Sequence, residues 1–196
     1  DMLRDPDDLA ILDGVLKLPE AFGLHCVPEG VSSIQHGRIL LQLGCEVAQG
    51  YAIARPMPAA GMVDWVDRWK APDDWSNVRR LDTVGLELLY AEVEQQAWVS
   101  HLVAHLQGVV ASPPGPLKQT RLARLLRDKS SLGNGSGLSK KLKASLKGMQ
   151  DLAAEMIRLR AEKDVHAALA RLPEIEVRRD EVLDHLRTLA KTAIVP

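Results

Sequence analysis

The sequence predicts an α/β segment followed by an all-α antiparallel helical bundle. Three observations lead to this prediction. The 196 residues are 46% hydrophobic and 26% charged, as in soluble globular proteins. No aromatic residue follows Trp98, so the second half must pack with Leu, Ala, Val, Ile and Met, most of which favour helices over strands. The first 70 residues instead alternate between amphipathic stretches and short apolar runs, as βα units do.

The N-terminal segment is expected to contain three helices and two strands. Asp5 and Pro6 indicate the first helix start, because Asp caps helices and Pro fits the first turn. Ser32 or Ser33 is expected to cap the second helix, and Gly44 to close it. The predicted elements are a helix at 5–20, a strand at 24–27, a helix at 33–43, a strand at 45–48 and a helix at 58–69.

Two polar residues follow the predicted strands directly. Glu29 comes after the first strand and Gln49 after the second. Functional groups of parallel α/β folds gather at the carboxyl ends of strands, and adjacent strands lie about 4.8 Å apart. Both side chains are therefore expected to converge on one site. Taken on their spacing alone, they also fit ordinary solvated loop residues.

At these residues the sequence resembles the C-terminal part of an EAL domain, the cyclic-di-GMP phosphodiesterase family of bacterial signalling. The resemblance covers most of residues 1–70. The matching stretches are Val27-Pro28-Glu29-Gly30-Val31, Leu41-Gln42-Leu43-Gly44-Cys45, Gln49-Gly50-Tyr51 and Ala54-Arg55-Pro56-Met57-Pro58. The resemblance implies partial TIM-barrel βα units. In the complete family domain, two Mg²⁺ or Mn²⁺ ions activate the water that opens the cyclic dinucleotide.

The resemblance implies vestigial catalytic roles for two residues. Glu29 matches the acidic residue that supports the metal-bound water, and it would serve the metal only if the missing barrel half were supplied. Gln49 matches an amide that orients ligands at the metal site. The family's other metal ligands and its catalytic lysine would lie upstream of Asp1, and Ser32-Ser33 departs from the usual motif. We therefore expect no bound cofactor and no phosphodiesterase activity from this chain. Only its EAL lineage would class it as an enzyme.

Residues 71–80 are expected to be a linker, because Lys70-Ala71-Pro72-Asp73-Asp74 is polar and contains proline. Residues 81–196 are expected to form the helical bundle. Its predicted pieces are a helix from Leu81 to Gly108, a basic helix at 116–128, a flexible loop at 133–137, a helix at 138–163 and a last pair divided at Pro173.

The bundle faintly resembles the chemoreceptor zinc-binding (CZB) domains. Trp98 and Leu152-Ala153-Ala154-Glu155 are the best matching positions. The resemblance implies a degenerate sensor without zinc, because none of the residues at its four ligand positions is a usual zinc ligand. These positions are Gln95, Thr120, Leu146 and Gln150. His101 and His105 share a helix face, but two histidines make an incomplete site.

Charge is distributed unevenly along the chain. Residues 116–150 carry nine Lys or Arg against one Asp, whereas the chain as a whole has a net charge of −1. This segment fits a solvated stripe or a dock for an acidic partner. Nucleic acid is the least favoured partner, because the segment has no aromatic residue for base stacking.

Taken together, the residues favour an EAL-lineage cyclic-di-GMP signalling protein that is inactive as this chain. The alternative is a non-catalytic helical interaction or sensory module. We expect a protein partner or self-association through residues 1–70, and no cyclic-di-GMP binding by this chain alone. No membrane span or signal peptide is evident and the two cysteines lack a redox spacing, so we expect a cytoplasmic protein.

Overall fold

The chain folds as two units in the computed structural model, which describes residues 1–127 and 137–193. Unit 1 consists of residues 1–3 and 7–81. Unit 2 consists of residues 4–6 and the chain from Asp82 onward.

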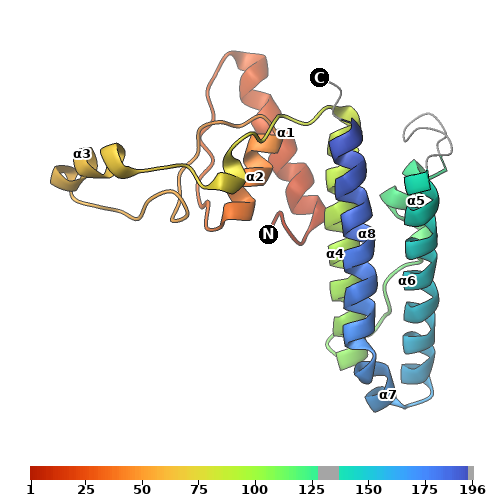
Figure 1. Cartoon of the computed structure of the whole chain (residues 1–196). Coiled ribbons are helices and arrows are strands. Elements are labelled where there is room, and N and C mark those ends of the chain that lie inside the picture. The colour runs from red at the N-terminus through yellow and green to blue at the C-terminus, as the bar shows by residue number, and fades with distance from the viewer. Residues whose placement is uncertain (128–136, 194–196) are drawn as a thin grey trace. The chain divides into compact units, whose positions relative to one another are not determined.

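Every regular element among the described residues is a helix (Figure 1). In unit 1 these are α1 (Pro6–Phe22), α2 (Ile34–Gln42), α3 (Ala59–Arg68) and the 3₁₀ helix η1 (Asp73–Trp75). In unit 2 they are α4 (Thr83–Gln107), the 3₁₀ helix η2 (Leu117–Gln119), α5 (Arg121–Leu125), α6 (Gly137–Ala161), α7 (Val165–Ala170) and α8 (Leu172–Ala193).

The prediction of an α/β fold with partial TIM-barrel units is wrong. Residues 24–27 and 45–48 form no strand. The stretches that contain them are joined by backbone hydrogen bonds: Gln49 N–H donates to the Pro28 carbonyl at 2.9 Å, Val31 N–H to the Gln49 carbonyl at 3.1 Å and Ala52 N–H to the Val31 carbonyl at 2.9 Å. A parallel ladder places one residue between such a carbonyl and amide, whereas two residues lie between Pro28 and Val31. This bulge, and the missing amide of Pro28, stop the ladder from propagating.

Unit 1 is held together around α2. The Trp75 indole N–H donates to the Ile34 carbonyl at 2.7 Å, which fixes η1 against α2. The indole lies so close to Gly37 that a Cβ there would come 2.3 Å from the ring. Leu81 N–H donates to the Gln42 carbonyl at 2.8 Å. Residues 71–81 therefore fold back along α2.

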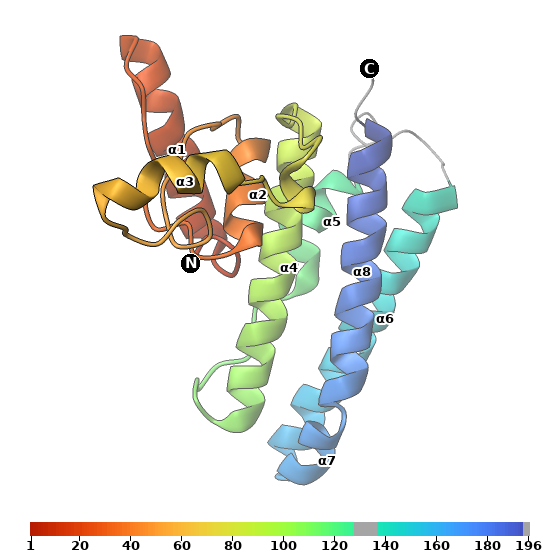
Figure 2. The same cartoon turned by 60° about the vertical axis from the view of Figure 1, so that its left-hand side comes forward.

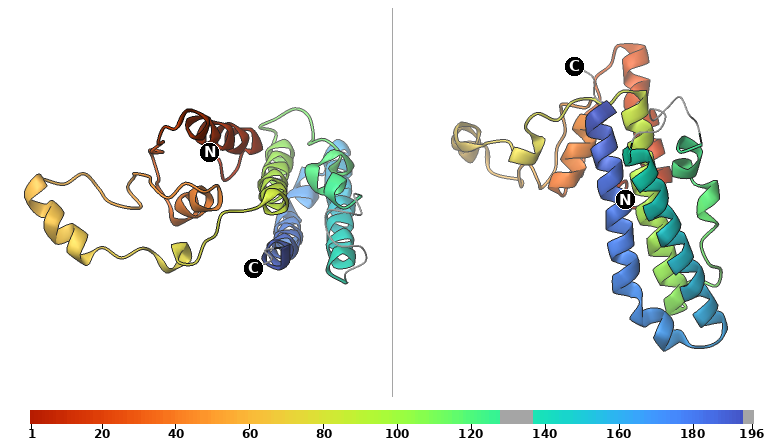
Figure 3. Two further views of the ribbon diagram at one scale, coloured as in Figure 1. Left: turned by 90° about the horizontal axis from the view of Figure 1, so that it is seen from above. Right: turned by 45° about the vertical axis from the view of Figure 1, so that its right-hand side comes forward.

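Unit 2 is a bundle of three long helices, which confirms the predicted helical half. α8 packs between α4 and α6 and runs antiparallel to both (Figures 1 and 2). The left view of Figure 3 shows the same three helices nearly end-on. The shared core contains the fully buried side chains of Leu102, Met149, Met156 and Leu186. These are the aliphatic residue types from which the sequence predicted a bundle.

Several predicted helix ends agree with the structure. Ser33 caps α2 by accepting from the His36 amide at 3.2 Å. Gly108 ends α4 with φ of 82°, a left-handed conformation that glycine adopts at little cost. Pro173 lies in the first turn of α8, where its missing N–H costs no helical hydrogen bond.

The predicted loop at 133–137 lies, except for Gly137, outside the described residues. Among the helices that the structure describes, none combines the length and the apolar character needed to cross a membrane.

Candidate functional site

Glu29 and Gln49 lie where two extended segments of unit 1 are joined by backbone hydrogen bonds. The backbone bonds between Gln49, Pro28 and Val31 bring the two residues together without a sheet. Gly50 permits this approach, since a Cβ on it would lie 2.3 Å from both the nitrogen and the oxygen of Val31. These two residues are thus brought together by the close approach of two loops at Gly50, which we call the crossing, rather than by parallel strands.

Both residues line an open cavity of about 590 Å³. Its other side is formed by Met62 and Trp65 of α3 and by Tyr51. The Arg55 guanidinium, also in the lining, lies 5.0 Å from the centre of the Tyr51 ring, within range of a cation–π contact. The cavity thus combines one carboxylate, one amide, one guanidinium and two aromatic rings.

The donor set of this cavity does not fit the paired cations that the EAL resemblance implies. Each Mg²⁺ requires near-octahedral coordination by six oxygens. Glu29 is the one carboxylate in the lining, and Gln49 adds one amide oxygen. Within residues 1–127 and 137–193, no group of three or more His, Cys, Asp or Glu is placed to hold a metal.

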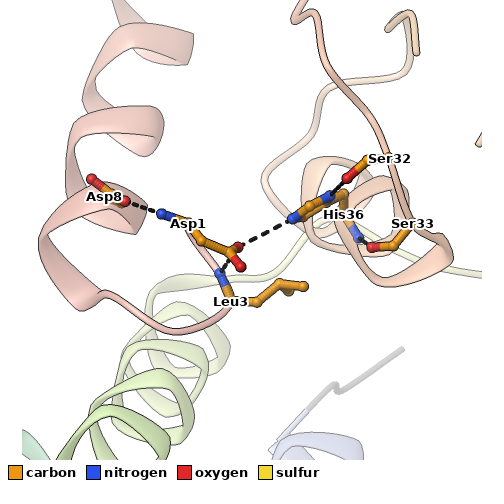
Figure 4. A network of polar contacts seen from close by, with 6 residues as sticks. All are labelled: Asp1, Leu3, Asp8, Ser32, Ser33 and His36. Carbon is orange, nitrogen blue, oxygen red and sulfur yellow. Dashed lines mark hydrogen bonds and ion pairs between the residues drawn. The ribbon is translucent and has the colours of Figure 1, made fainter. Parts of the chain in front are cut away.

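Glu29 also borders a second groove of about 340 Å³, between α1 and the start of α2. This groove is lined mainly by apolar side chains, including Ile11, Val15 and Leu40. His36 stands at its edge, with its Nδ1 3.0 Å from the Ser32 hydroxyl and its Nε2 3.2 Å from the Asp1 carboxylate (Figure 4). Partial burial, with a smaller contribution from the amino group of Asp1, lowers the pKa of His36.

The cysteines of unit 1 are free thiols and are half-buried. The Cys45 thiol donates to the Val47 carbonyl at 3.2 Å. Burial raises the pKa of Cys45, and the neighbouring Cys26 acts in the same direction. A raised pKa lowers the thiolate fraction, so the structure offers no activated nucleophile at Cys45.

The four positions to which the CZB resemblance would assign zinc ligands lie in unit 2. Gln95 is completely buried in α4, and Leu146 is part of the bundle core. The buried Thr120 hydroxyl donates to the Leu117 carbonyl at 2.6 Å and accepts from the Ala123 amide at 3.3 Å, which makes it the cap of α5. Gln150 is exposed.

His101 and His105 contact a loop rather than each other. His101 Nε2 lies 3.1 Å from the Ser112 carbonyl, and His105 Nδ1 lies 3.4 Å from the Val110 carbonyl. The Trp98 indole on the same face of α4 donates to the Gly115 carbonyl at 2.7 Å. The three rings hold residues 108–116 against α4, a structural role that the i, i+4 spacing alone does not distinguish from metal binding.

The basic segment contributes an exposed lysine row to α6. The row consists of Lys140, Lys141, Lys143 and Lys147. By contrast, several arginines of the bundle form ion pairs, among them Arg187 with Glu92 at 2.5 Å and Arg121 with Glu87 at 2.8 Å.

Sequence reasoning missed the residues that shape unit 1 around the site. Trp75 falls in the stretch predicted to be a linker, although a tryptophan beside Asp73-Asp74 is a packing signal. Gly37 lies inside a helix, where a glycine indicates close approach of another group. Gly50 was part of a recognised motif, but its contact with Val31 was not foreseen.

Comparison with curated proteins gives short matches to proteins of cyclic di-GMP signalling. The chain is 41% identical over 64 residues to the cyclic di-GMP phosphodiesterase RocR of Pseudomonas aeruginosa, a stretch that covers 33% of this chain and 16% of RocR. It is 37% identical over 59 residues to the bifunctional diguanylate cyclase/cyclic di-GMP phosphodiesterase MucR of the same organism, covering 30% of this chain and 9% of MucR.

A third match is the probable cyclic di-GMP phosphodiesterase PdeN of Escherichia coli, 36% identical over 62 residues, covering 32% of this chain and 12% of PdeN. The chain thus corresponds to a small part of each relative. No protein-family model matches it, and no solved structure does. About a third of the chain is therefore homologous to cyclic di-GMP signalling proteins.

Proposed function

We propose that this chain is a cyclic di-GMP signalling protein of the EAL lineage that does not hydrolyse the dinucleotide and acts through protein association. The observation that carries the proposal is the 41% identity with RocR over 64 residues. The placement of Glu29 and Gln49 in one cavity supports descent from a phosphodiesterase site, since a backbone crossing keeps the two residues together.

Our expectation that this chain does not turn over the dinucleotide is supported by the donor set of the cavity. Two-metal hydrolysis needs cations that clamp both the attacking and the leaving oxygen. Each Mg²⁺ is usually anchored by one or two carboxylates, whereas this cavity offers a single carboxylate and a single amide for two ions.

Association is the role that remains for unit 1, and we place it in residues 1–70. This segment has many exposed large hydrophobic side chains, among them Phe22 at 75% and Val63 at 69%. Apolar surface of this extent in a small unit is typical of interaction sites. The bundle of unit 2, with no zinc ligand at the four CZB-like positions, would then serve as a non-catalytic module.

The test incubates the full chain with cyclic di-GMP and Mn²⁺ and quantifies the linear product by chromatography. We expect no product above that of a heat-inactivated sample, while a complete phosphodiesterase converts the substrate under the same conditions. Turnover that disappears in Glu29→Gln would overturn the proposal, because Glu29 would then be a working catalytic group.

A second arm measures binding by calorimetry with cyclic di-GMP alone. We expect no saturable heat for the wild-type chain. Saturable heat that Arg55→Ala abolishes and Arg68→Ala preserves would identify a nucleotide receptor and would overturn association as the main role. Arg68 is a suitable control because it is an exposed arginine of unit 1 that does not line the cavity.

A further inference from the structure

We infer that α6 binds an acidic helix of a partner protein along three aligned lysines, Lys140, Lys143 and Lys147. All three belong to the lysine row and are exposed. The inference concerns unit 2. It therefore goes beyond the proposed association through residues 1–70 and does not depend on it.

The three lysines lie on one line along α6. They follow one another at intervals of three and four residues, so they fall within an arc of about 60° around the helix and span about 10 Å along it. The opposite side of α6 is buried in the bundle core through Leu142 and Met149. The fourth member of the row, Lys141, lies about 100° around the helix from Lys140, and Asp151 ends the run of positive charge.

The three aligned lysines have no partner among the described residues. Within residues 1–127 and 137–193, none of their ammonium groups takes part in a hydrogen bond or an ion pair. Carboxylates of the three long helices are instead engaged by arginines: Glu155 of α6 by Arg171, Glu181 of α8 by Arg178 and Glu92 of α4 by Arg187. The bundle thus neutralises these acidic groups with arginine and leaves the aligned lysines to solvent.

The placement of these lysines is unfavourable for the isolated helix. Lys140 is the fourth residue of α6, near the end where the helix dipole is positive and a cation is disfavoured. Like charges three and four residues apart on a helix also repel each other. The first turn of α6 contains no acidic residue that would compensate. The carboxylates of a bound partner would relieve both repulsions.

The composition of this surface favours a protein over a membrane or a nucleic acid. None of the exposed large hydrophobic residues belongs to α6, so the helix offers no apolar anchor for a lipid bilayer. No aromatic residue follows Trp98, so there are no rings on which bases could stack. Intervals of three and four residues match the side-chain spacing on one face of a second helix. A helix with Glu or Asp at these intervals would place carboxylates opposite all three lysines.

The test uses the full chain and a fluorescein-labelled, Ala-rich peptide with Glu at alternating intervals of three and four residues. A length of about 21 residues allows such a peptide to form a helix. Fluorescence anisotropy measures its binding at about 0.05 M and about 0.15 M salt. We expect saturable binding that weakens as the salt concentration rises. A peptide of the same composition, with its glutamates spread around the helix, should bind about fivefold more weakly.

Removing the aligned lysines should weaken the binding of the first peptide. The variant is Lys140→Gln/Lys143→Gln/Lys147→Gln, which keeps long side chains of good helix propensity. We expect about a tenfold loss of affinity, since each exposed ion pair contributes a factor of up to about five. Circular dichroism verifies that the variant folds.

The matched control removes the same charge elsewhere. Lys70→Gln/Arg79→Gln/Lys141→Gln changes three exposed residues that lie outside the line. We expect its affinity for the peptide to change by less than about twofold, because charges beyond a Debye length are screened and Lys141 lies on another side of α6. Equal losses in the two triple variants would overturn the aligned site, because net charge alone would then explain the binding.

Three further results would also overturn the inference. They are the absence of saturable binding by the wild-type chain at the lower salt concentration, equal binding of the two peptides, and tighter binding to phosphatidylserine vesicles or to a DNA duplex than to the first peptide. The last result, if lost in the aligned-lysine variant, would identify a membrane or nucleic-acid surface instead. None of these results bears on the dinucleotide turnover assay, which tests the proposed function separately.

Discussion

Two single residues of this molecule matter because of a group that is missing: a side-chain Cβ in one case and a hydrogen-bond partner in the other. At Gly50 the missing Cβ lets two loops cross, and at Gln95 a buried amide has no hydrogen-bond partner within residues 1–127 and 137–193. The sequence marks both residues, one inside a family motif and the other in an apolar helical seam. Neither the crossing nor the missing partner could be predicted, because both depend on backbone atoms far away in the sequence.

Substituting Gly50 with Ala tests the crossing. A Cβ 2.3 Å from the Val31 backbone must displace it, because backbone cannot rotate away as a side chain can. We expect a loss of about 1–3 kcal/mol in the stability of unit 1. Hydrogen exchange should show faster exchange of the Val31 and Gln49 amides. Gly61→Ala in α3 is the control, since its Cβ would meet no atom, and equal effects of both variants would contradict the role of the crossing.

Replacing Gln95 with Leu should stabilise the bundle. Gln95 is completely buried, and neither its amide nitrogen nor its amide oxygen has a hydrogen-bond partner among the described residues. An unsatisfied buried polar group costs about 1–3 kcal/mol, much of which an apolar side chain of similar size recovers. Urea unfolding should show a gain of about 1 kcal/mol. A loss of stability would indicate that Gln95 has a partner in solution.

At the scale of elements, helices could be predicted and strands could not. Gly108 marks the end of α4 and Ser33 marks the start of α2, so local signals suffice for these helix ends. A strand depends on neighbours that its own sequence does not contain. Residues 24–27 and 45–48 are apolar enough for strands, but two short segments with a bulge beside Pro28 form only a few hydrogen bonds.

The long helices of unit 2 are joined by arginine contacts as well as by their core. Arg187 of α8 contacts Glu92 of α4 at 2.5 Å, and Arg160 of α6 donates to the Leu106 carbonyl of α4 at 2.5 Å. The second contact satisfies a carbonyl in the last turn of α4 that has no helical partner. Arg171, which lies between α7 and α8, connects this turn to α6 by its ion pair with Glu155 at 2.5 Å.

A double-mutant cycle on Glu92→Gln and Arg187→Gln measures the first of these contacts. Arg187 is 48% and Glu92 19% exposed, so water screens the pair only in part. We expect a coupling energy of about 0.5–1 kcal/mol from chemical unfolding, reduced at about 1 M salt. Arg179→Gln serves as the control, because in the described part of the chain Arg179 bonds to its neighbour Asp180 within the same helix, α8. A coupling that is zero at low salt would contradict a stabilising pair.

At the scale of the whole molecule, the chain combines a unit of short helices and extended segments with a bundle. Glu29 and Gln49, which the sequence predicts to converge, line one cavity in the structure, while their role there stays a prediction. Its flanking aromatic and basic residues, Trp65 and Arg55, were not predicted as part of it. Both residues follow Gly50 in the chain, and their positions depend on the path that the chain takes after the crossing. No local sequence pattern encodes that path.

Zinc titration tests the whole bundle as a sensor. The CZB-like positions hold Gln95, Thr120, Leu146 and Gln150, and Thr120 is engaged as a helix cap. We expect calorimetry to show no binding tighter than about 1 μM, because amide, hydroxyl and aliphatic groups are poor zinc ligands. A stoichiometric, tighter isotherm would contradict this, and its loss in His101→Ala or His105→Ala would locate the ligands on α4.

The antiparallel packing of α4 against α8 places the start of one beside the finish of the other, as Figures 1 and 2 show. A polypeptide therefore enters this module at Thr83 and leaves it at Ala193 from the same side. A domain whose two ends lie close together can be inserted into a surface loop of another protein without separating the ends of that loop. This closeness also means that joining the two points by a short tether, and opening the chain elsewhere, would yield a circularly permuted version with the same core.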